Sequence, residues 1–175
     1  LAQVRMALAK IRRSTSKGDW LTGLDTAKRV LPEVESEEAL GEVRAELAGL
    51  LPDIVDGVAQ SAAAARDNIQ ARQIVSLFAQ AMELANNPVF LPGELRAAQT
   101  PRLQAAQEQV DVVVRGLERE EKLNEVVTSM KAATAAGKFA DAYRSYADLI
   151  QLYPRLEHEP RLQTSVSSIS NELAG

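Results

Sequence analysis

The chain has 175 residues, of which 46% are hydrophobic and 25% are charged, a composition typical of a folded domain with enough apolar side chains for a core. Its formal net charge of −4 argues against nucleic acid and anionic lipid as partners, because both normally require a basic surface. Cysteine is absent, which excludes a disulfide framework, a thiol nucleophile and a thiolate metal site.

Two further features of composition bear on class and topology. Only 4% of the residues are aromatic, whereas alanine and leucine are abundant, and this favours an all-α fold. Charges interrupt every apolar window before the ~18 to 20 residues that a membrane-spanning helix needs. The start, Leu1-Ala2-Gln3-Val4-Arg5, lacks methionine and a signal-peptide pattern. We therefore expect a chain without membrane insertion that belongs to a longer protein, and its compartment stays open.

The first 32 residues predict a helical hairpin. The apolar stripe of the first helix consists of Val4, Leu8, Ile11 and Thr15. This helix ends at Lys17-Gly18, and Asp19 is placed to cap a second one. The stripe of the second helix consists of Trp20, Leu24, Ala27 and Leu31. Pro32 closes it, because proline cannot continue the hydrogen-bond ladder of a helix.

Further helices are predicted between residues 36 and 85. One begins at Ser36, with acidic residues near the positive end of its dipole, and ends at Pro52. Its stripe consists of Leu40, Val43, Leu47 and Leu50. Two more follow, on either side of the polar run Arg66-Asp67-Asn68. Their stripes are Ile54, Val58, Ala62 and Ala65, and Ile69, Ile74, Leu77, Phe78, Ala81 and Leu84. A single helix from about 53 to 85 is the alternative, since Asp and Asn favour turns without forbidding a helix.

The clearest loop covers residues 86–93, where two prolines and a glycine are close together. It is a candidate sub-boundary within what we otherwise expect to be one domain over residues 1–175. Thr100-Pro101 then predicts the start of a long helix around 100–136. Its first stripe consists of Leu103, Ala106, Val110, Val113 and Leu117, and its second of Leu123, Val126, Val127, Met130 and Ala133. The step of six between the stripes turns the helix by about 240°, so its two halves should face different neighbours.

The segment from 136 to 154 is the most informative part of the chain. It contains a glycine corner, a helix with the aromatic set Phe139, Tyr143, Tyr146 and Tyr153, and a proline stop. The spacing of these aromatic residues favours core packing, with Tyr143 or Tyr153 the most exposed, and a recognition patch is the alternative. Trp20 has the same two interpretations. A last helix begins near Pro160 with the stripe Leu162, Val166, Ile169 and Leu173, and it is placed to cap the stack.

Residues 123–154 resemble a tetratricopeptide repeat, a helix–turn–helix unit of ~34 residues. The matching positions are Gly137, Phe139, Ala142, Tyr146 and Pro154. Residues 4–32 match more loosely, through Gly18, Trp20, Gly23 and Ala27. The two glycine corners lie about three and a half repeat lengths apart. The resemblance implies stacked antiparallel helical hairpins, arranged as an irregular right-handed TPR-like solenoid.

The resemblance also implies a binding groove, because the concave face of such stacks is lined mainly by the first helix of each hairpin. On this chain it points to Arg5 and Arg12 in one hairpin and to Asn124 and Lys131 in the other. The two members of each pair are seven positions apart and so share a helical face. Such a face is suited to a peptide carboxylate or an acidic segment, and an ordinary solvated surface is the alternative.

No motif in the sequence predicts an enzyme. The acidic cluster Glu118, Glu120, Glu121 and Glu125 contains interleaved Arg119 and Lys122, and is best interpreted as a charged helix surface. His158 is the only histidine, and the glycines form no phosphate-binding pattern. We therefore expect no catalytic residue, cofactor or metal. The predicted function is a non-enzymatic scaffold that binds a protein or peptide. The alternative is a structural or spacer helical bundle that self-associates as a homo-oligomer through residues 100–136 or tethers subunits.

Overall fold

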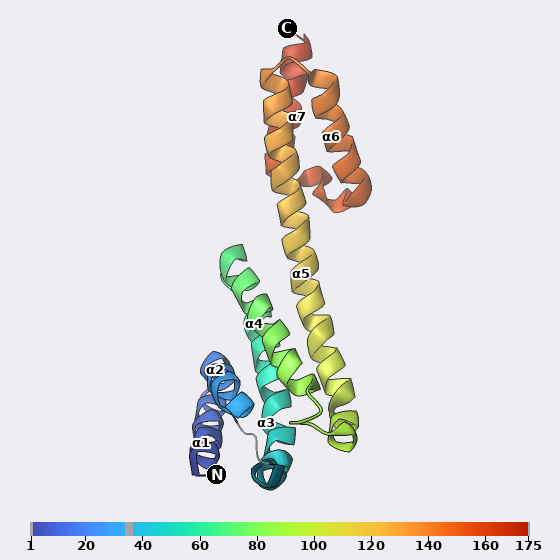
Figure 1. The fold of residues 1–175 in the computed structure, drawn as a ribbon. Coiled ribbons are helices and arrows are strands. Elements are labelled where there is room, and N and C mark those ends of the chain that lie inside the picture. The colour runs from blue at the N-terminus through green and yellow to red at the C-terminus, as the bar shows by residue number, and fades with distance from the viewer. Residues whose placement is uncertain (1, 34–36, 175) are drawn as a thin grey trace. The chain divides into compact units, whose positions relative to one another are not determined.

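The structure is a computed structural model that describes residues 2–33 and 37–174, without the side chains of 33, 37–40, 42, 43 and 174. These residues form seven α-helices and two 3-10 helices, with no β-strand among them, which confirms the all-α class (Figure 1). They make up two compact units, Leu1–Val114 and Arg115–Gly175, and the boundary between the units falls within helix α5. Each unit has its own hydrophobic core.

The predicted first hairpin is present in the first unit. Helix α1 (Ala2–Ser16) buries Val4, Leu8 and Ile11, and helix α2 (Trp20–Val30) follows after a tight turn. As predicted, the side chain of Asp19 caps α2 by accepting a hydrogen bond from the backbone N–H of Thr22 at 3.3 Å. The chain then tightens into the 3-10 helix η1 (Leu31–Glu33), which contains Pro32.

The prediction that a helix ends at Pro52 was wrong, because helix α3 (Glu37–Ala63) continues through this residue. Proline inside a helix costs about 3 kcal/mol. Leu51, Ile54 and Val55, on either side of it, are almost completely buried, and each such side chain contributes about 1.5 to 3 kcal/mol. Packing therefore outweighs the lost hydrogen bond. The expected cap Ser36 and the side chains of Leu40 and Val43 lie outside the described residues.

The polar run at 66–68 separates two helices, so the alternative of one helix from 53 to 85 does not apply. Helix α4 (Asn68–Asn86) begins after Asp67, whose side chain accepts a hydrogen bond from the N–H of Gln70 at 2.8 Å. Ile74 and Phe78 are buried as predicted. Ile69 was wrongly placed in the stripe, since it lies in the first turn of α4 and is 69% exposed. Helices α3 and α4 lie side by side as a second hairpin (Figure 1).

Helix α5 (Gly93–Ala135) begins seven residues before the predicted start at Thr100-Pro101. The hydroxyl of Thr100 donates to the carbonyl of Arg96 at 3.0 Å, one turn earlier, and therefore does not cap a helix end. Arg96 secures the first turns by donating from Nη1 to the carbonyl of Asn86 at 3.0 Å, and Leu95 packs against the first core. These contacts stabilise helical residues before Thr100-Pro101, so the helix begins earlier than this local start signal predicts.

An ion pair reinforces the packing of α5 on α3 within the first unit. Arg102 donates from Nη2 to Asp53 and from Nε to Asp56, both at 2.5 Å. Burial alone would lower the pKa of Arg102, but the hydrogen bonds and charges of the two carboxylates outweigh it and raise this pKa. The same guanidinium thus joins two positions one turn apart on α3.

The two predicted stripes of α5 pack in different cores, as expected from the step between them. Leu103, Ala106 and Val110 belong to the core of the first unit. Leu123 and Met130 belong to the core of the second unit. The long helix therefore contributes one face to each unit.

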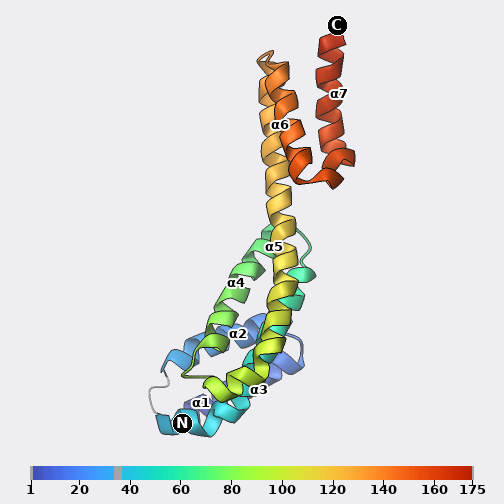
Figure 2. The same ribbon diagram turned by 90° about the vertical axis from the view of Figure 1, so that its right-hand side faces the viewer.

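The second unit contains the end of α5, helix α6 (Phe139–Leu152), the 3-10 helix η2 (Pro154–His158) and helix α7 (Pro160–Ala174). Each α-helix runs antiparallel to the one before it, and η2 lies in the connection between α6 and α7 (Figure 2). Leu162 and Ile169 of α7 are buried, but Leu173, also predicted in this stripe, is 68% exposed near the helix end. Phe139, Tyr146 and Tyr153 pack against the core, which confirms the core interpretation for these three residues. Tyr143, one of the two residues expected to be the most exposed, is 56% exposed.

The two glycine corners have the same backbone conformation. Gly18 and Gly137 have φ angles of 75° and 74°, in the left-handed region that favours glycine. In each corner the next residue donates its N–H to a carbonyl five positions earlier at 2.8 Å, namely Asp19 to Ser14 and Lys138 to Ala133. This pattern is a Schellman motif, which ends one helix and turns the chain into the next.

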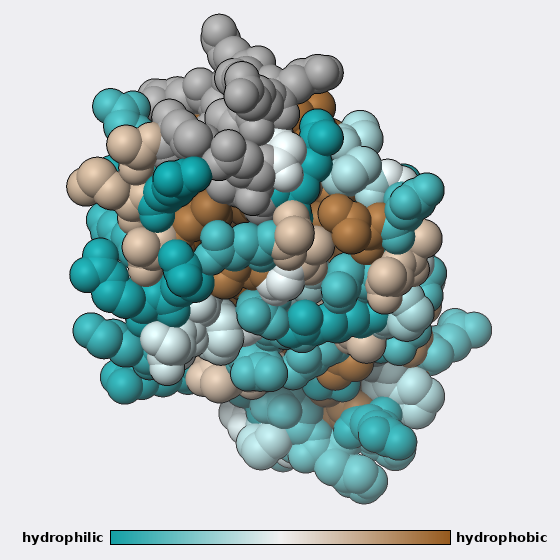
Figure 3. All heavy atoms as spheres, turned by 90° about the horizontal axis from the view of Figure 1, so that it is seen from below, coloured by the Kyte–Doolittle hydropathy of each residue, from teal (hydrophilic) through white to brown (hydrophobic). Residues whose placement is uncertain are grey.

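Trp20 is half-buried against the first core, as the core-packing interpretation predicted. Its indole ring lies directly on Gly57 of α3, where a Cβ atom would come within 1.9 Å of the ring. Gly57 therefore leaves the space that the ring occupies. On the face drawn in Figure 3, hydrophobic residues outside the grey ones form small areas between hydrophilic ones.

We predict that Gly57→Ala destabilises the protein by about 1 to 3 kcal/mol, because the added methyl group displaces the Trp20 ring. Gly49→Ala, also on α3, is the matched control, since a Cβ there meets nothing within 4 Å. Alanine at this site should stabilise the helix by up to about 1 kcal/mol. Urea unfolding of both variants measures the difference, and equal midpoints for the two would contradict the packing of Trp20 on Gly57.

Candidate functional site

The four residues that the resemblance pointed to lie in both units. Arg5 and Arg12 are exposed on α1 in the first unit. Arg12 donates from Nε to Glu46 of α3 at 2.6 Å, so its charge is already paired. Asn124 and Lys131 are exposed on the part of α5 that belongs to the second unit.

Asn124 and Lys131 line one groove of about 450 Å³ between α5 and α7. Its lining residues are Asn124, Val127, Thr128, Lys131, Arg161 and Thr164. Those from α5 are three or four positions apart and so share one helical face. The structure thus brings together the two residues predicted in this hairpin, and it adds a face of α7 that the sequence did not point to.

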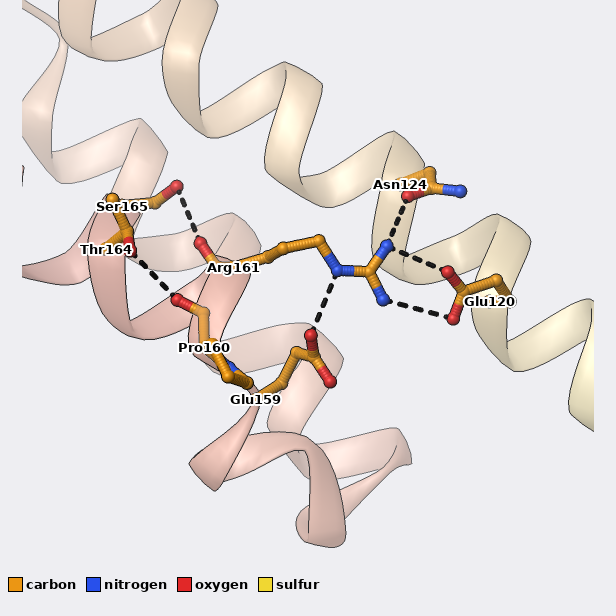
Figure 4. Close-up of polar contacts among 7 residues, drawn as sticks. All are labelled: Glu120, Asn124, Glu159, Pro160, Arg161, Thr164 and Ser165. Atoms are coloured by element: carbon orange, nitrogen blue, oxygen red, sulfur yellow. Dashed lines mark hydrogen bonds and ion pairs between the residues drawn. The ribbon is translucent and has the colours of Figure 1, made fainter.

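Arg161 joins the two sides of this groove (Figure 4). Its Nη1 donates to Glu120 at 2.8 Å and to the Oδ1 atom of Asn124 at 2.9 Å, and its Nη2 donates to the second oxygen of Glu120 at 3.2 Å. Its Nε donates to Glu159 at 2.9 Å. The guanidinium of α7 is therefore paired in a fork with a carboxylate of α5, the geometry that arginine favours with carboxylates.

These contacts shift the pKa values of both partners. The hydrogen bond from Arg161 holds the pKa of Glu120 below its ordinary value, although burial opposes the shift. The hydrogen bonds to Glu120 and Glu159 raise the pKa of Arg161 above its ordinary value. Both side chains therefore stay charged over the physiological pH range.

The contact with Arg161 also fixes the orientation of the Asn124 amide. A guanidinium has only donors, so the oxygen of the amide must face it. The NH₂ group of Asn124 consequently points away from Arg161 (Figure 4). Its two N–H donors are then available to a ligand.

The other polar groups of the groove include further donors. Lys131 has no ion-pair partner among residues 2–33 and 37–174, and its ammonium group carries three donors. The hydroxyl of Thr128 is exposed on the same face of α5. The hydroxyl of Thr164 donates to the carbonyl of Pro160 at 3.0 Å, which leaves it to act as an acceptor. The residues of α5 that line the groove therefore include a lysine and two side chains with neutral donors, Asn124 and Thr128.

A second groove in the same unit, of about 310 Å³, has a different character. It lies between α5 and α6, and Lys122 pairs there with Glu125 at 3.4 Å. Asp148 and the exposed Leu152 contribute an acidic and an apolar group. Since its cation is already paired, this groove is less suited to an anion than the one between α5 and α7.

Other residues considered in the sequence have plain structural settings. His158 is exposed at the end of η2. Within the described part of the chain, no three acidic or histidine residues are grouped as metal ligands, and Glu120 of the acidic cluster is paired with Arg161. No helix among these residues is both long and apolar enough to cross a bilayer.

Sequence reasoning missed Arg161 because α7 lies outside the segment that resembles a repeat. Its contacts to Glu120 and Asn124 span 41 and 37 residues, and no local pattern shows that these positions meet. The only available signal was an arginine in the first turn of a predicted helix, directly after Pro160. Comparisons with protein-family models, curated proteins and solved structures find no match to this chain. The groove and its contacts therefore carry the functional interpretation.

We predict that Glu120→Gln lowers the stability of the protein at pH 7 by up to about 1 kcal/mol, the range for ion pairs that are partly exposed. Because the pKa of Glu120 is lowered by folding, its contribution is fully present above the ordinary glutamate value of about 4.5 and is lost as pH falls below it. The stability difference between wild type and variant should shrink accordingly. Urea unfolding from pH 7 downward measures it, and a difference that stays constant into acid would contradict the ion pair.

Proposed function

We propose that this chain is a non-enzymatic, tetratricopeptide-like binding module that holds a carboxylate-bearing segment of a partner protein in the groove between α5 and α7. The observation that carries this proposal is the Asn124 amide, whose oxygen accepts from Arg161 at 2.9 Å and whose NH₂ group is thereby turned away from it. A fixed donor on the same helical face as Lys131, which has no ion-pair partner in the described part of the chain, is suited to a carboxylate.

Several features of the fold support the tetratricopeptide-like part of the proposal. The corners at Gly18 and Gly137 have the same φ angle and the same hydrogen bonds. In the first unit α3 packs against both members of the preceding hairpin, α1 and α2, as successive hairpins of a stack do. In the second unit α5 and α7 would be the first helices of two neighbouring hairpins, and such helices line the groove of a stack.

The alternative function, self-association through residues 100–136, has less support. Val110 is 1% exposed in the first core, and Val113 packs against the same core. A charge at either position would disrupt the fold of this unit before it could separate two chains. Val112 is 61% exposed, but a single apolar side chain does not make an interface.

An acidic peptide tests the proposal. The probe is an eight-residue peptide of alternating alanine and glutamate with blocked ends, and its glutamine counterpart is the uncharged control. We expect amide chemical shifts of Asn124, Thr128 and Lys131 to move with the acidic peptide and not with the control. Shifts confined to other residues, or none at all, would contradict a carboxylate site in this groove.

We further predict that Lys131→Ala weakens this binding by about 3- to 10-fold, the effect of losing a charge-assisted contact that is partly exposed to water. Lys122→Ala is the matched control, since it removes the same charge from α5 on the side that lines the other groove. Titration of both variants with the acidic peptide measures the effect. Equal losses for the two would show non-specific attraction instead of a site.

A further inference from the structure

We propose that Glu120 is a built-in competitor for the groove, and that a ligand carboxylate binds by taking its place on Arg161. This inference rests on the proposed function. The inference adds a residue that limits the affinity of the groove for its ligand. Among the residues that line the groove, Arg161 is the strongest carboxylate-binding group, and a carboxylate of the chain itself already occupies it.

The geometry of the pair is that of a bound ligand. Both oxygens of Glu120 contact Arg161, one at 2.8 Å from Nη1 and the other at 3.2 Å from Nη2. An aspartate or glutamate side chain of a peptide would make the same two hydrogen bonds. The chemistry that stabilises Glu120 here is therefore the chemistry that would recognise an acidic peptide.

The pair is accessible enough to exchange. The side chains of Arg161 and Glu120 are 42% and 31% exposed, so a ligand reaches them without opening a core. A partly exposed pair of this kind is weak enough for a ligand to replace.

Arg161 remains in place when Glu120 leaves. Its Nε is held by Glu159, two residues earlier in the chain, at 2.9 Å, and Nη1 keeps its bond to Asn124. The contact that is given up is the one to Glu120, which is the only acceptor of Nη2 within the described part of the chain. The released fork then points to the place that the Glu120 carboxylate occupied, beside the Asn124 side chain that lines the groove (Figure 4).

If the exchange takes place, replacing Glu120 lowers the stability of the protein and raises its affinity for the ligand. Removing the carboxylate of Glu120 takes an ion pair from the folded protein and at the same time frees Arg161 for the ligand. If the ion pair were purely structural, its removal would lower the stability of the protein with no gain in affinity for the ligand. This difference in sign separates the two roles.

The test is titration of Glu120→Gln with the alternating alanine–glutamate peptide, together with its melting temperature. We expect binding about 3- to 5-fold tighter than wild type, with a lower melting temperature. Glu121→Gln is the matched control, because it removes the same charge from the neighbouring exposed position without contact to Arg161. It should change the affinity by less than 2-fold.

Arg161→Lys provides the second variant, since lysine cannot form the fork. In this background Glu120→Gln should no longer raise affinity. Affinity unchanged or reduced in Glu120→Gln, or raised equally in Glu121→Gln, would overturn the exchange while leaving the groove in place. If neither wild type nor Glu120→Gln binds the acidic peptide, the proposed function itself is wrong.

Discussion

The architecture depends on one constraint, that an amphipathic helix buries only the stripe that its apolar residues form. Helix α5 carries two such stripes, and the step of six from Leu117 to Leu123 rotates the second one away from the first. Its early residues, such as Val110, therefore complete one core, and its late residues, such as Met130, complete another. The late part of α5 is also the helix that supplies Asn124 and Lys131, so the phase of its second stripe decides which polar residues face the groove.

The parts of the fold that were predictable from sequence depend on local backbone chemistry. Gly18 and Gly137 were identified because only a residue without a side chain readily takes their positive φ angles. Pro52 and Pro101 misled for the opposite reason. Pro52 locally signals the end of a helix and Pro101 the start of one, but both lie inside helices, where contacts distant in sequence decide the outcome. Among these contacts are Ile54 in the first core and Arg102 on Asp53.

The candidate site was predictable to the same limited extent. Asn124 and Lys131 share a helical face, which their spacing of seven shows without a structure. Their partner could not be found in this way, because Arg161 reaches them from a helix that begins only after α6 and η2. The groove forms because α6 and η2 bring α7 back beside α5. Only the folded chain shows which residue of α7 then lies opposite Glu120.

The guanidinium of Arg161 both orients the Asn124 amide and pairs with Glu120. By donating to the oxygen of Asn124, Arg161 fixes the orientation of that amide, and a fixed donor would lower the cost of organising the proposed site for a ligand. Its pairing with Glu120 occupies the two terminal nitrogens of the guanidinium and stabilises the packing of α7 on α5. In the proposed exchange, a ligand that displaces Glu120 must make up for that lost stability. The exchange that we propose therefore favours partners that bring a carboxylate to Arg161 and a second acceptor to Asn124 or Lys131 over isolated carboxylates.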